Sequence, residues 1–215
     1  MNLANKLTLS RMLMVPLLVV CLVPERITNV QKITSYQFVI MIARHVALLV
    51  FVVAALTDYI DGKIARKYNM ITNLGKLLDP LADKILVAAA FVAFVDLDIF
   101  PAWFVIVILF REFIVTGLRS LGTAQGRVIQ ADRWGKHKTL WQMLTILLTL
   151  VFLAMRDTLV WAGQWEKAFH GLALEWWFDN VLIRILMGIC LYFTLLSGAL
   201  YMFRNWDLVR EEPMK

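Results

Sequence analysis

The chain has 215 residues, of which 60% are hydrophobic and 18% are charged, and its formal net charge is +6. Its mean hydropathy of +0.70 excludes an ordinary water-soluble domain. The apolar runs are long and do not alternate with polar residues, which indicates transmembrane helices rather than barrel strands. Excess positive charge in such a protein reports orientation and contact with anionic lipid, and no nucleic-acid-binding module is visible in the sequence.

Six apolar segments have roughly the 20 residues that a helix needs to cross a bilayer. We expect them, within a single domain spanning 1–215, at residues 7–24, 36–60, 76–96, 100–121, 138–157 and 181–203. The first resembles a signal peptide, because Lys6 and Arg11 precede its apolar run. No small-residue cleavage site follows, so we interpret this segment as a retained anchor. The predicted fold is therefore an all-α integral membrane protein with six transmembrane helices.

Lysine and arginine residues are divided unequally between the two ends of the predicted helices. If the N-terminus is inside, the outer side carries Arg26, Lys32, Arg156, Lys167 and Arg184. The inner side carries Lys6, Arg11, Lys63, Arg66, Lys67, Lys76, Lys84, Arg119, Arg127, Arg133, Lys136, Lys138, Arg204, Arg210 and Lys215. Because positive residues accumulate on the cytoplasmic side of membrane proteins, this bias predicts that both termini are cytoplasmic.

Four aspartates stand within 26 residues, where the second predicted helix ends and the third begins. Asp58 and Asp61 are three apart, and Asp79 and Asp83 are four apart, so each pair lies on one face of a helix. Salt bridges to nearby Lys and Arg are one interpretation, but they leave this spacing unexplained. Oxygen ligands without histidine or cysteine favour magnesium, manganese or calcium. The pattern therefore predicts a site for two divalent ions, which often serves displacement at phosphorus.

Small and basic residues accompany these aspartates. Gly62 and Ala65 remove side-chain bulk, so a ligand can approach the helix closely. Arg66 adds a planar guanidinium suited to phosphate. Gly75 follows the hydrophilic stretch 67–73, which we expect to form the turn between the two helices. The segment thus predicts phosphate binding next to the metal ions.

The pattern D-x2-D-G-x2-A-R-x8-G-x3-D-x3-D over residues 58–83 resembles the signature of the CDP-alcohol phosphotransferases at every defined position. The resemblance covers nearly the whole chain. It implies two divalent cations, Mg2+ or Mn2+, held by Asp58, Asp61, Asp79 and Asp83, with Asp83 also acting as the general base. It implies a CDP site formed by Thr8, Gly62, Ala65, Arg66 and Gly75. The Thr8 hydroxyl has an alternative interpretation as a helix-start cap.

A second basic group is a candidate site for the acceptor phosphate: Arg111, Arg119, Lys136 and Lys138. The two arginines are eight residues apart, so they share a helix face about two turns apart. Arg111 should lie deeper and need a partner, and it is either structural or pocket-lining. Glu112 is adjacent in sequence, so we expect it to point elsewhere on the helix. His137 is interpreted as a solvated loop residue, and Arg44 as having an interhelical or snorkelling role.

The segments R-E-x6-R at 111–119, G-K-x-K-T at 135–139 and N-x-L-T-x-x-R at 5–11 resemble the branch of the family that uses glycerol 3-phosphate. That branch implies CDP-diacylglycerol as donor, glycerol 3-phosphate as acceptor, membrane lipid as surroundings and a homodimer. The Lys and Arg bias described above places the expected active site on the cytoplasmic face of the cell membrane.

Alternative functions remain open at this point. Within the family the acceptor could be inositol phosphate, serine or phosphatidylglycerol, although the basic cluster favours a phosphorylated acceptor over serine. A cation transporter should carry polar or acidic groups near the bilayer midplane, whereas these acids gather at one face. A membrane scaffold leaves the aspartate spacing unexplained.

Overall fold

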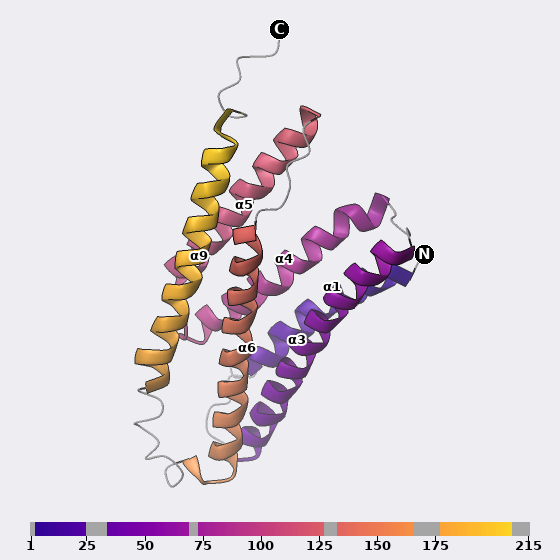
Figure 1. The fold of residues 1–215 in the computed structure, drawn as a ribbon. Helices are drawn as coiled ribbons and strands as arrows, with labels where there is room; N and C mark the ends of the chain where they lie inside the picture. The colour runs from indigo at the N-terminus through magenta and orange to yellow at the C-terminus, as the bar shows by residue number, and fades with distance from the viewer. Residues whose placement is uncertain (1–2, 25–33, 69–72, 127–132, 166–176, 208–215) are drawn as a thin grey trace.

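The computed structural model describes residues 3–24, 34–68, 73–126, 133–165 and 177–207. Within these ranges only the backbone is described at residues 3–8, 34–35, 58–81, 83, 124, 133 and 179–180. The described elements are α1 (Leu3–Leu22), α3 (Thr34–Tyr68), α4 (Asn73–Asp96), α5 (Ala102–Ala124), α6 (Arg133–Trp161), the short π-helix η1 (Phe178–Leu182) and α9 (Ile183–Arg204) (Figure 1). No strand occurs in this part of the chain, which confirms the all-α class.

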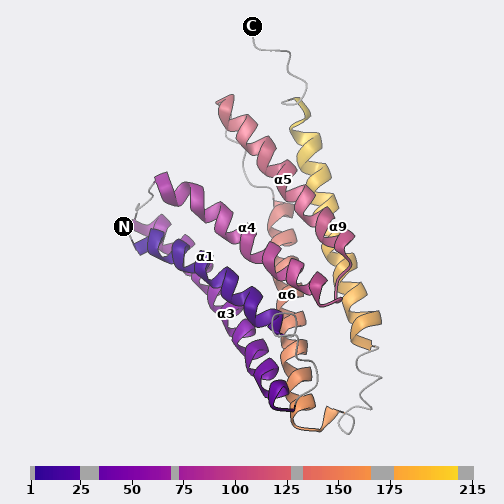
Figure 2. The same cartoon turned by 180° about the vertical axis from the view of Figure 1, so that it is seen from behind.

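The helices pack as two connected groups. The first helix, α1, contacts both α3 and α4, so these three form one group. The second group has α9 between α5 and α6, which it contacts on either side. Contacts of α3 with α6, and of α4 with α5 and α6, join the groups. Figures 1 and 2 show the helices spreading apart toward the end of the molecule where α1 begins.

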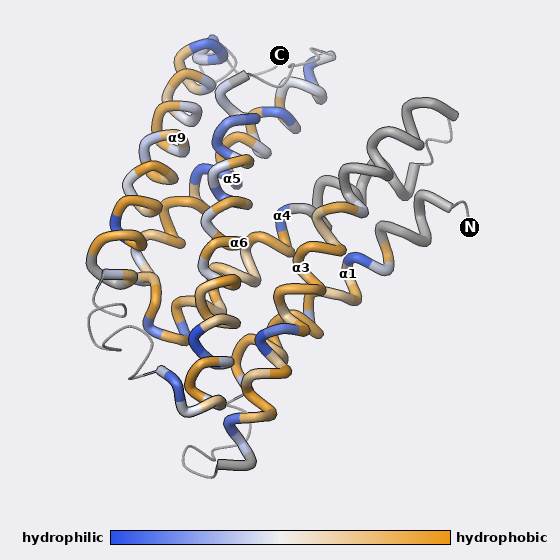
Figure 3. Tube along the Cα trace, turned by 60° about the horizontal axis from the view of Figure 1, so that its bottom comes forward, coloured by the Kyte–Doolittle hydropathy of each residue, from blue (hydrophilic) through white to orange (hydrophobic). Residues whose placement is uncertain are grey.

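The described helices have the apolar character of membrane spans. Three of them contain stretches long and apolar enough to cross a bilayer, Tyr36–Thr57, Trp134–Trp161 and Ile183–Arg204, and α1 adds a shorter run at Leu9–Leu22. Apolar residues dominate the chain trace in Figure 3. Large apolar side chains such as Phe113 and Phe203, 73% and 78% exposed, suit contact with lipid rather than water. The chain is therefore a membrane protein, and the count of six spans stays a prediction.

An aromatic cluster closes the turn between α4 and α5. Phe100 lies 5.7 Å from Phe91 and 5.2 Å from Phe104, measured between ring centroids, and all three are buried. Pro101 precedes the first turn of α5 with φ −70°, a value its ring favours. This cluster holds the end of α4 that is remote from the predicted aspartate site.

The helices extend beyond the predicted spans at their polar ends. The second span was expected to end at residue 60, but α3 continues to Tyr68, and α4 begins at Asn73. The expected turn at 67–73 is therefore wrong in its bounds, because Lys and Arg are good helix formers and continue the helix past the apolar run. His137 likewise lies within α6, so its interpretation as a loop residue is wrong.

A buried ion pair ties three helices together in the half of the molecule away from the aspartates. Arg44 on α3 places its Nε 3.3 Å from Oδ2 of Asp157 on α6, and these side chains are 3% and 7% exposed. The same arginine donates from Nη1 to the backbone oxygen of Leu22 at the end of α1. The interhelical partner expected for Arg44 is thereby confirmed.

Candidate active site

The four motif aspartates lie on the two helices that the segment 69–72 connects. Asp58 and Asp61 precede the end of α3 by ten and seven residues, and Asp79 and Asp83 follow the start of α4 by six and ten. At 1.5 Å per residue, the four positions are about 9–15 Å from the connected helix ends. Figure 1 shows the end of α3 and the start of α4 at the same end of the molecule, beside the start of α1. The backbone therefore carries both pairs to matching depths.

The residue types at these positions fit a pair of hard divalent cations. Four carboxylates without nitrogen or sulfur donors suit magnesium or manganese. Elsewhere, among the side chains that the structure describes, no group of three or more His, Cys, Asp or Glu could hold a metal ion. The aspartate side chains themselves lie outside the described part of the chain, so their coordination stays a prediction.

The predicted CDP-binding residues lie on the three helices of the first group. Thr8 lies on α1, Gly62, Ala65 and Arg66 lie on α3, and Gly75 lies on α4. Their side chains also fall outside the described set. Arg11 follows Thr8 by three residues and is 2% exposed on α1, which packs against both α3 and α4. A buried cation therefore stands on the helix that contacts both aspartate-bearing helices.

Two of the predicted acceptor residues meet at one carboxylate. Arg111 on α5 donates from Nη1 to Oε1 of Glu112 at 3.1 Å, and Lys138 on α6 donates from Nζ to the same oxygen. Arg111 also donates from Nη2 to Oγ of Ser197 on α9, at 3.0 Å. The expectation that Glu112 points away from Arg111 is wrong, because both side chains are long enough to turn toward each other. Arg111 does have the partner that its depth required.

A lysine that was not predicted as an acceptor residue links this cluster to the aspartate motif. Lys84 directly follows Asp83 on α4, and its Nζ donates to Oγ1 of Thr116 on α5. Thr116 in turn donates to the backbone oxygen of Glu112 at 2.7 Å. Glu112 therefore lies one helical turn from Thr116, and Thr116 is hydrogen-bonded to Lys84, the residue next to Asp83.

Arg119 and Lys136 lie apart from this carboxylate. Arg119 donates from Nε to the hydroxyl of Tyr201 at 3.3 Å, and its Cζ lies 5.6 Å from the centre of that ring. Both cations are exposed. His137 is exposed as well, with its ring 6.1 Å from that of Phe193. Within the described residues, only two of the four predicted acceptor residues therefore converge on Glu112.

A glycine on α9 makes room for Arg111. A Cβ added to Gly198 would lie 3.0 Å from Cγ of Arg111, which is tighter than ordinary packing, whereas one added to Gly135 on α6 would lie at an ordinary contact distance of 3.9 Å from Nη2. Neither Gly198 nor its neighbour Ser197 was expected in the site. The signal that could have found them is the Ser-Gly pair inside an apolar helix, since small residues mark close helix contacts in membranes.

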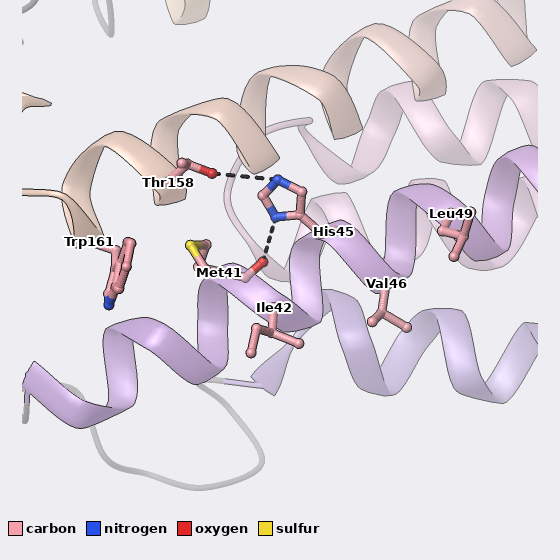
Figure 4. A pocket seen from close by; sticks show the side chains of 7 residues that line it. All are labelled: Met41, Ile42, His45, Val46, Leu49, Thr158 and Trp161. Atoms are coloured by element: carbon pink, nitrogen blue, oxygen red, sulfur yellow. Dashed lines mark hydrogen bonds between the residues drawn. The ribbon is translucent and has the colours of Figure 1, made fainter.

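A separate groove lies between the first half of α3 and the end of α6 (Figure 4). It has a volume of 480 Å³ and is lined by Met41, Ile42, His45, Val46, Leu49, Thr158 and Trp161. His45 is satisfied locally, with Nδ1 2.8 Å from the backbone oxygen of Met41 and Nε2 3.5 Å from Oγ1 of Thr158. This lining carries no Lys or Arg, so it does not suit a phosphate group.

Comparison with known proteins decides the family. The profile of the CDP-alcohol phosphatidyltransferases matches residues 1–196. This chain belongs to that family. The matched range contains every predicted site residue from Thr8 to Lys138, and it ends one residue before Ser197.

Relatives in the family share much of the chain. A CDP-diacylglycerol–glycerol-3-phosphate 3-phosphatidyltransferase of Bacillus subtilis is 37% identical over 209 residues, which are 97% of each chain. A Rickettsia felis protein of the same name is 33% identical over 150 residues, 70% of this chain and 75% of the relative. A probable phosphatidylglycerophosphate synthase of Mycobacterium tuberculosis is 38% identical over 153 residues, 71% of this chain and 68% of that protein.

Proposed function

We propose that this membrane protein transfers a phosphatidyl group from CDP-diacylglycerol to glycerol 3-phosphate, giving phosphatidylglycerol phosphate and CMP. The names of its relatives support this reaction, above all the Bacillus subtilis protein that matches over nearly its full length. The observation that carries the acceptor assignment is the contact from Lys84 to Thr116. It brings the Arg111–Glu112–Lys138 cluster, which suits a phosphorylated acceptor, close to the helix turn of Asp83.

The donor side of the reaction rests on the aspartate motif. Asp58, Asp61, Asp79 and Asp83 would hold two divalent cations, Mg2+ or Mn2+. When bound, such ions supply electrostatic stabilisation of the pyrophosphate and of the CMP leaving group. Gly62 and Ala65 leave room for the nucleotide, while Arg66 binds a phosphate oxygen. Thr8 and Gly75 complete the same CDP site in this proposal.

The acceptor side rests on the basic residues of α5 and α6. Arg111 and Lys138 bind the acceptor's phosphate, while Arg119 and Lys136 attract it at the exposed rim. This orients the acceptor hydroxyl toward Asp83, which takes its proton. The hydroxyl oxygen then bonds to the β-phosphorus as the bond from that phosphorus to CMP breaks. Positioning and electrostatics should supply more of the rate than the proton transfer does.

The topology that we propose for this reaction has six membrane spans within one domain, 1–215, and both termini in the cytoplasm. CDP-diacylglycerol would enter laterally from the inner leaflet, and glycerol 3-phosphate would arrive from the cytosol. A homodimer is the assembly that the family resemblance implies. The excess of Lys and Arg on the proposed inner side supports this orientation.

The direct test uses purified protein, CDP-diacylglycerol and a radiolabelled acceptor, with and without magnesium. We expect labelled phosphatidylglycerol phosphate and CMP with glycerol 3-phosphate, and loss of product in a chelator. Inositol phosphate, serine and phosphatidylglycerol are assayed in parallel. Product with one of these and none with glycerol 3-phosphate would overturn the proposed acceptor.

Asp83→Asn separates the base from the metal ligands. The amide cannot accept the proton, so turnover should fall by about 10²–10⁴-fold. Metal binding should persist, because three carboxylates and an amide oxygen remain, and it is measured by calorimetry with Mn2+. Asp58→Asn is the matched comparison, in which we expect weaker metal binding together with the lost turnover. Near-normal turnover of Asp83→Asn would exclude this residue as the base.

A further inference from the structure

Glu112 is a carboxylate placed among cations from three helices. Its Oε1 accepts from Arg111 on α5 and Lys138 on α6, and the positive charge of Lys84 on α4 also acts on it. The side chains of Arg111, Glu112 and Lys138 are 12%, 17% and 5% exposed. Among the side chains that the structure describes here, three cations therefore surround a single carboxylate. Such a surplus of positive charge favours an anionic ligand.

The geometry keeps two like charges together. Because Nη1 of Arg111 and Nζ of Lys138 bond to one oxygen, they lie no more than about 6 Å apart. Two cations that close repel strongly when little water surrounds them, and the shared carboxylate offsets this repulsion. Without it, this repulsion would favour a larger distance between the lysine and the arginine.

Arg111 is fixed on a second side but keeps a donor unused. Its Nη2 bonds to Ser197 on α9, and Gly198 on the same helix leaves space for its side-chain stem. Its Nε is buried and has no hydrogen-bond partner among the residues that the structure describes. A buried guanidinium donor without an acceptor is costly unless a ligand supplies one.

From these observations we propose that Glu112 is a positioning residue, which holds Arg111 and Lys138 side by side so that they bind the phosphate of the acceptor as a preformed pair. This rests on the proposed function, in that it assigns the cluster to the acceptor. Glu112 does not itself touch substrate. It acts by setting the distance between two groups that do.

The test compares kinetic constants of wild-type protein and Glu112→Gln, purified in the same lipid. Glutamine has nearly the same shape but cannot carry the charge that holds both cations. We expect the KM for glycerol 3-phosphate to rise at least about tenfold, since a neutral amide oxygen holds the two cations more weakly than the carboxylate does and their bonds to the phosphate become weaker. The KM for CDP-diacylglycerol and the melting temperature should change little. Glu112→Asp keeps the charge and should give an intermediate KM for glycerol 3-phosphate.

Opposite outcomes identify the competing explanations. If Glu112 only offsets the positive charge of the neighbouring lysines and arginine, the neutral glutamine should strengthen the attraction of the anionic acceptor. The KM for the acceptor would then fall, which would overturn the proposal. If it is only structural, both substrate KM values and the melting temperature should worsen together, which would also overturn it. Asp96→Asn, an exposed carboxylate at the other end of α4, is the control for loss of one negative charge.

The wild-type protein keeps this test separate from that of the proposed function. If wild type uses a different phosphorylated acceptor, the proposed acceptor fails, and the same comparison is made with the true one. An unphosphorylated acceptor would overturn the positioning role itself. If Glu112→Gln does not fold, Ser197→Ala removes the other fixed contact of Arg111 and should raise the same KM, and an unchanged value would count against the proposal.

Discussion

At the scale of single residues, the site depends on how side chains use the space between helices. Arg111 and Glu112 are neighbours in sequence and point about 100° apart on a helix, so sequence reasoning separated them. In the structure their long side chains meet at 3.1 Å, because Lys138 approaches from α6 and draws the carboxylate toward it. The attraction between Glu112 and a lysine on another helix thus outweighs the direction in which the helix alone would point the Glu112 side chain.

Gly198→Ala tests whether the close packing of Arg111 against α9 matters for acceptor binding. The added Cβ would lie 3.0 Å from Cγ of Arg111, so the arginine must shift by a few tenths of an ångström. We expect the KM for glycerol 3-phosphate to rise by up to about tenfold, because the displaced Arg111 guanidinium binds the acceptor phosphate less well. The KM for CDP-diacylglycerol should stay constant. Gly188→Ala is the matched control on the same helix, since no described atom outside its own stretch of α9 lies within 4 Å of its added Cβ. Equal effects of the two changes would contradict this role.

At the scale of elements, the helices carry polar groups where they contact one another. Sequence patterns predicted the helices themselves, because long apolar runs have few other stable forms in a membrane. Their ends were less predictable, since Lys63, Arg66 and Lys67 favour a helix as readily as a turn. Asp157 was also missed as the partner of Arg44, because 113 residues separate the two in sequence.

Asp157→Asn should destabilise the packing of α3 on α6. The change leaves Arg44 buried beside a neutral group, and breaking a buried pair commonly costs about 3–5 kcal/mol. The free energy of unfolding in detergent should fall accordingly, with a lower melting temperature. Arg156→Ala serves as the control, because the Arg156 side chain is 37% exposed and its contact with Asp157 should contribute at most about 1 kcal/mol. An Asp157→Asn protein as stable as wild type would show that the pair does not hold the helices together.

At the scale of the whole molecule, orientation in the membrane decides which side supplies the acceptor. The charge bias predicts that the end of α5 faces the cytoplasm and the end of α6 faces outward. Gln125 and Gln164 are exposed just beyond these two helices, so each is a suitable position for a cysteine.

Labelling of an introduced cysteine checks this topology. In spheroplasts, a membrane-impermeant maleimide should label Gln164→Cys and leave Gln125→Cys unlabelled until the membrane is permeabilised. The unaltered chain, with Cys21 and Cys190, gives the background. Labelling of Gln125→Cys in intact spheroplasts would reverse the predicted orientation and place the acceptor site on the outer face.

The amino-acid sequence was enough to predict the helical membrane class, the aspartate motif and a basic cluster for the acceptor, because all three depend on local composition and spacing. Asp58, Asp61, Asp79 and Asp83 are recognisable from their intervals alone, and the family match agrees with that pattern. The tertiary structure decided which basic residues meet. Glu112, Lys84, Ser197 and Gly198 come from three different helices, and only helix packing brings such distant positions into contact.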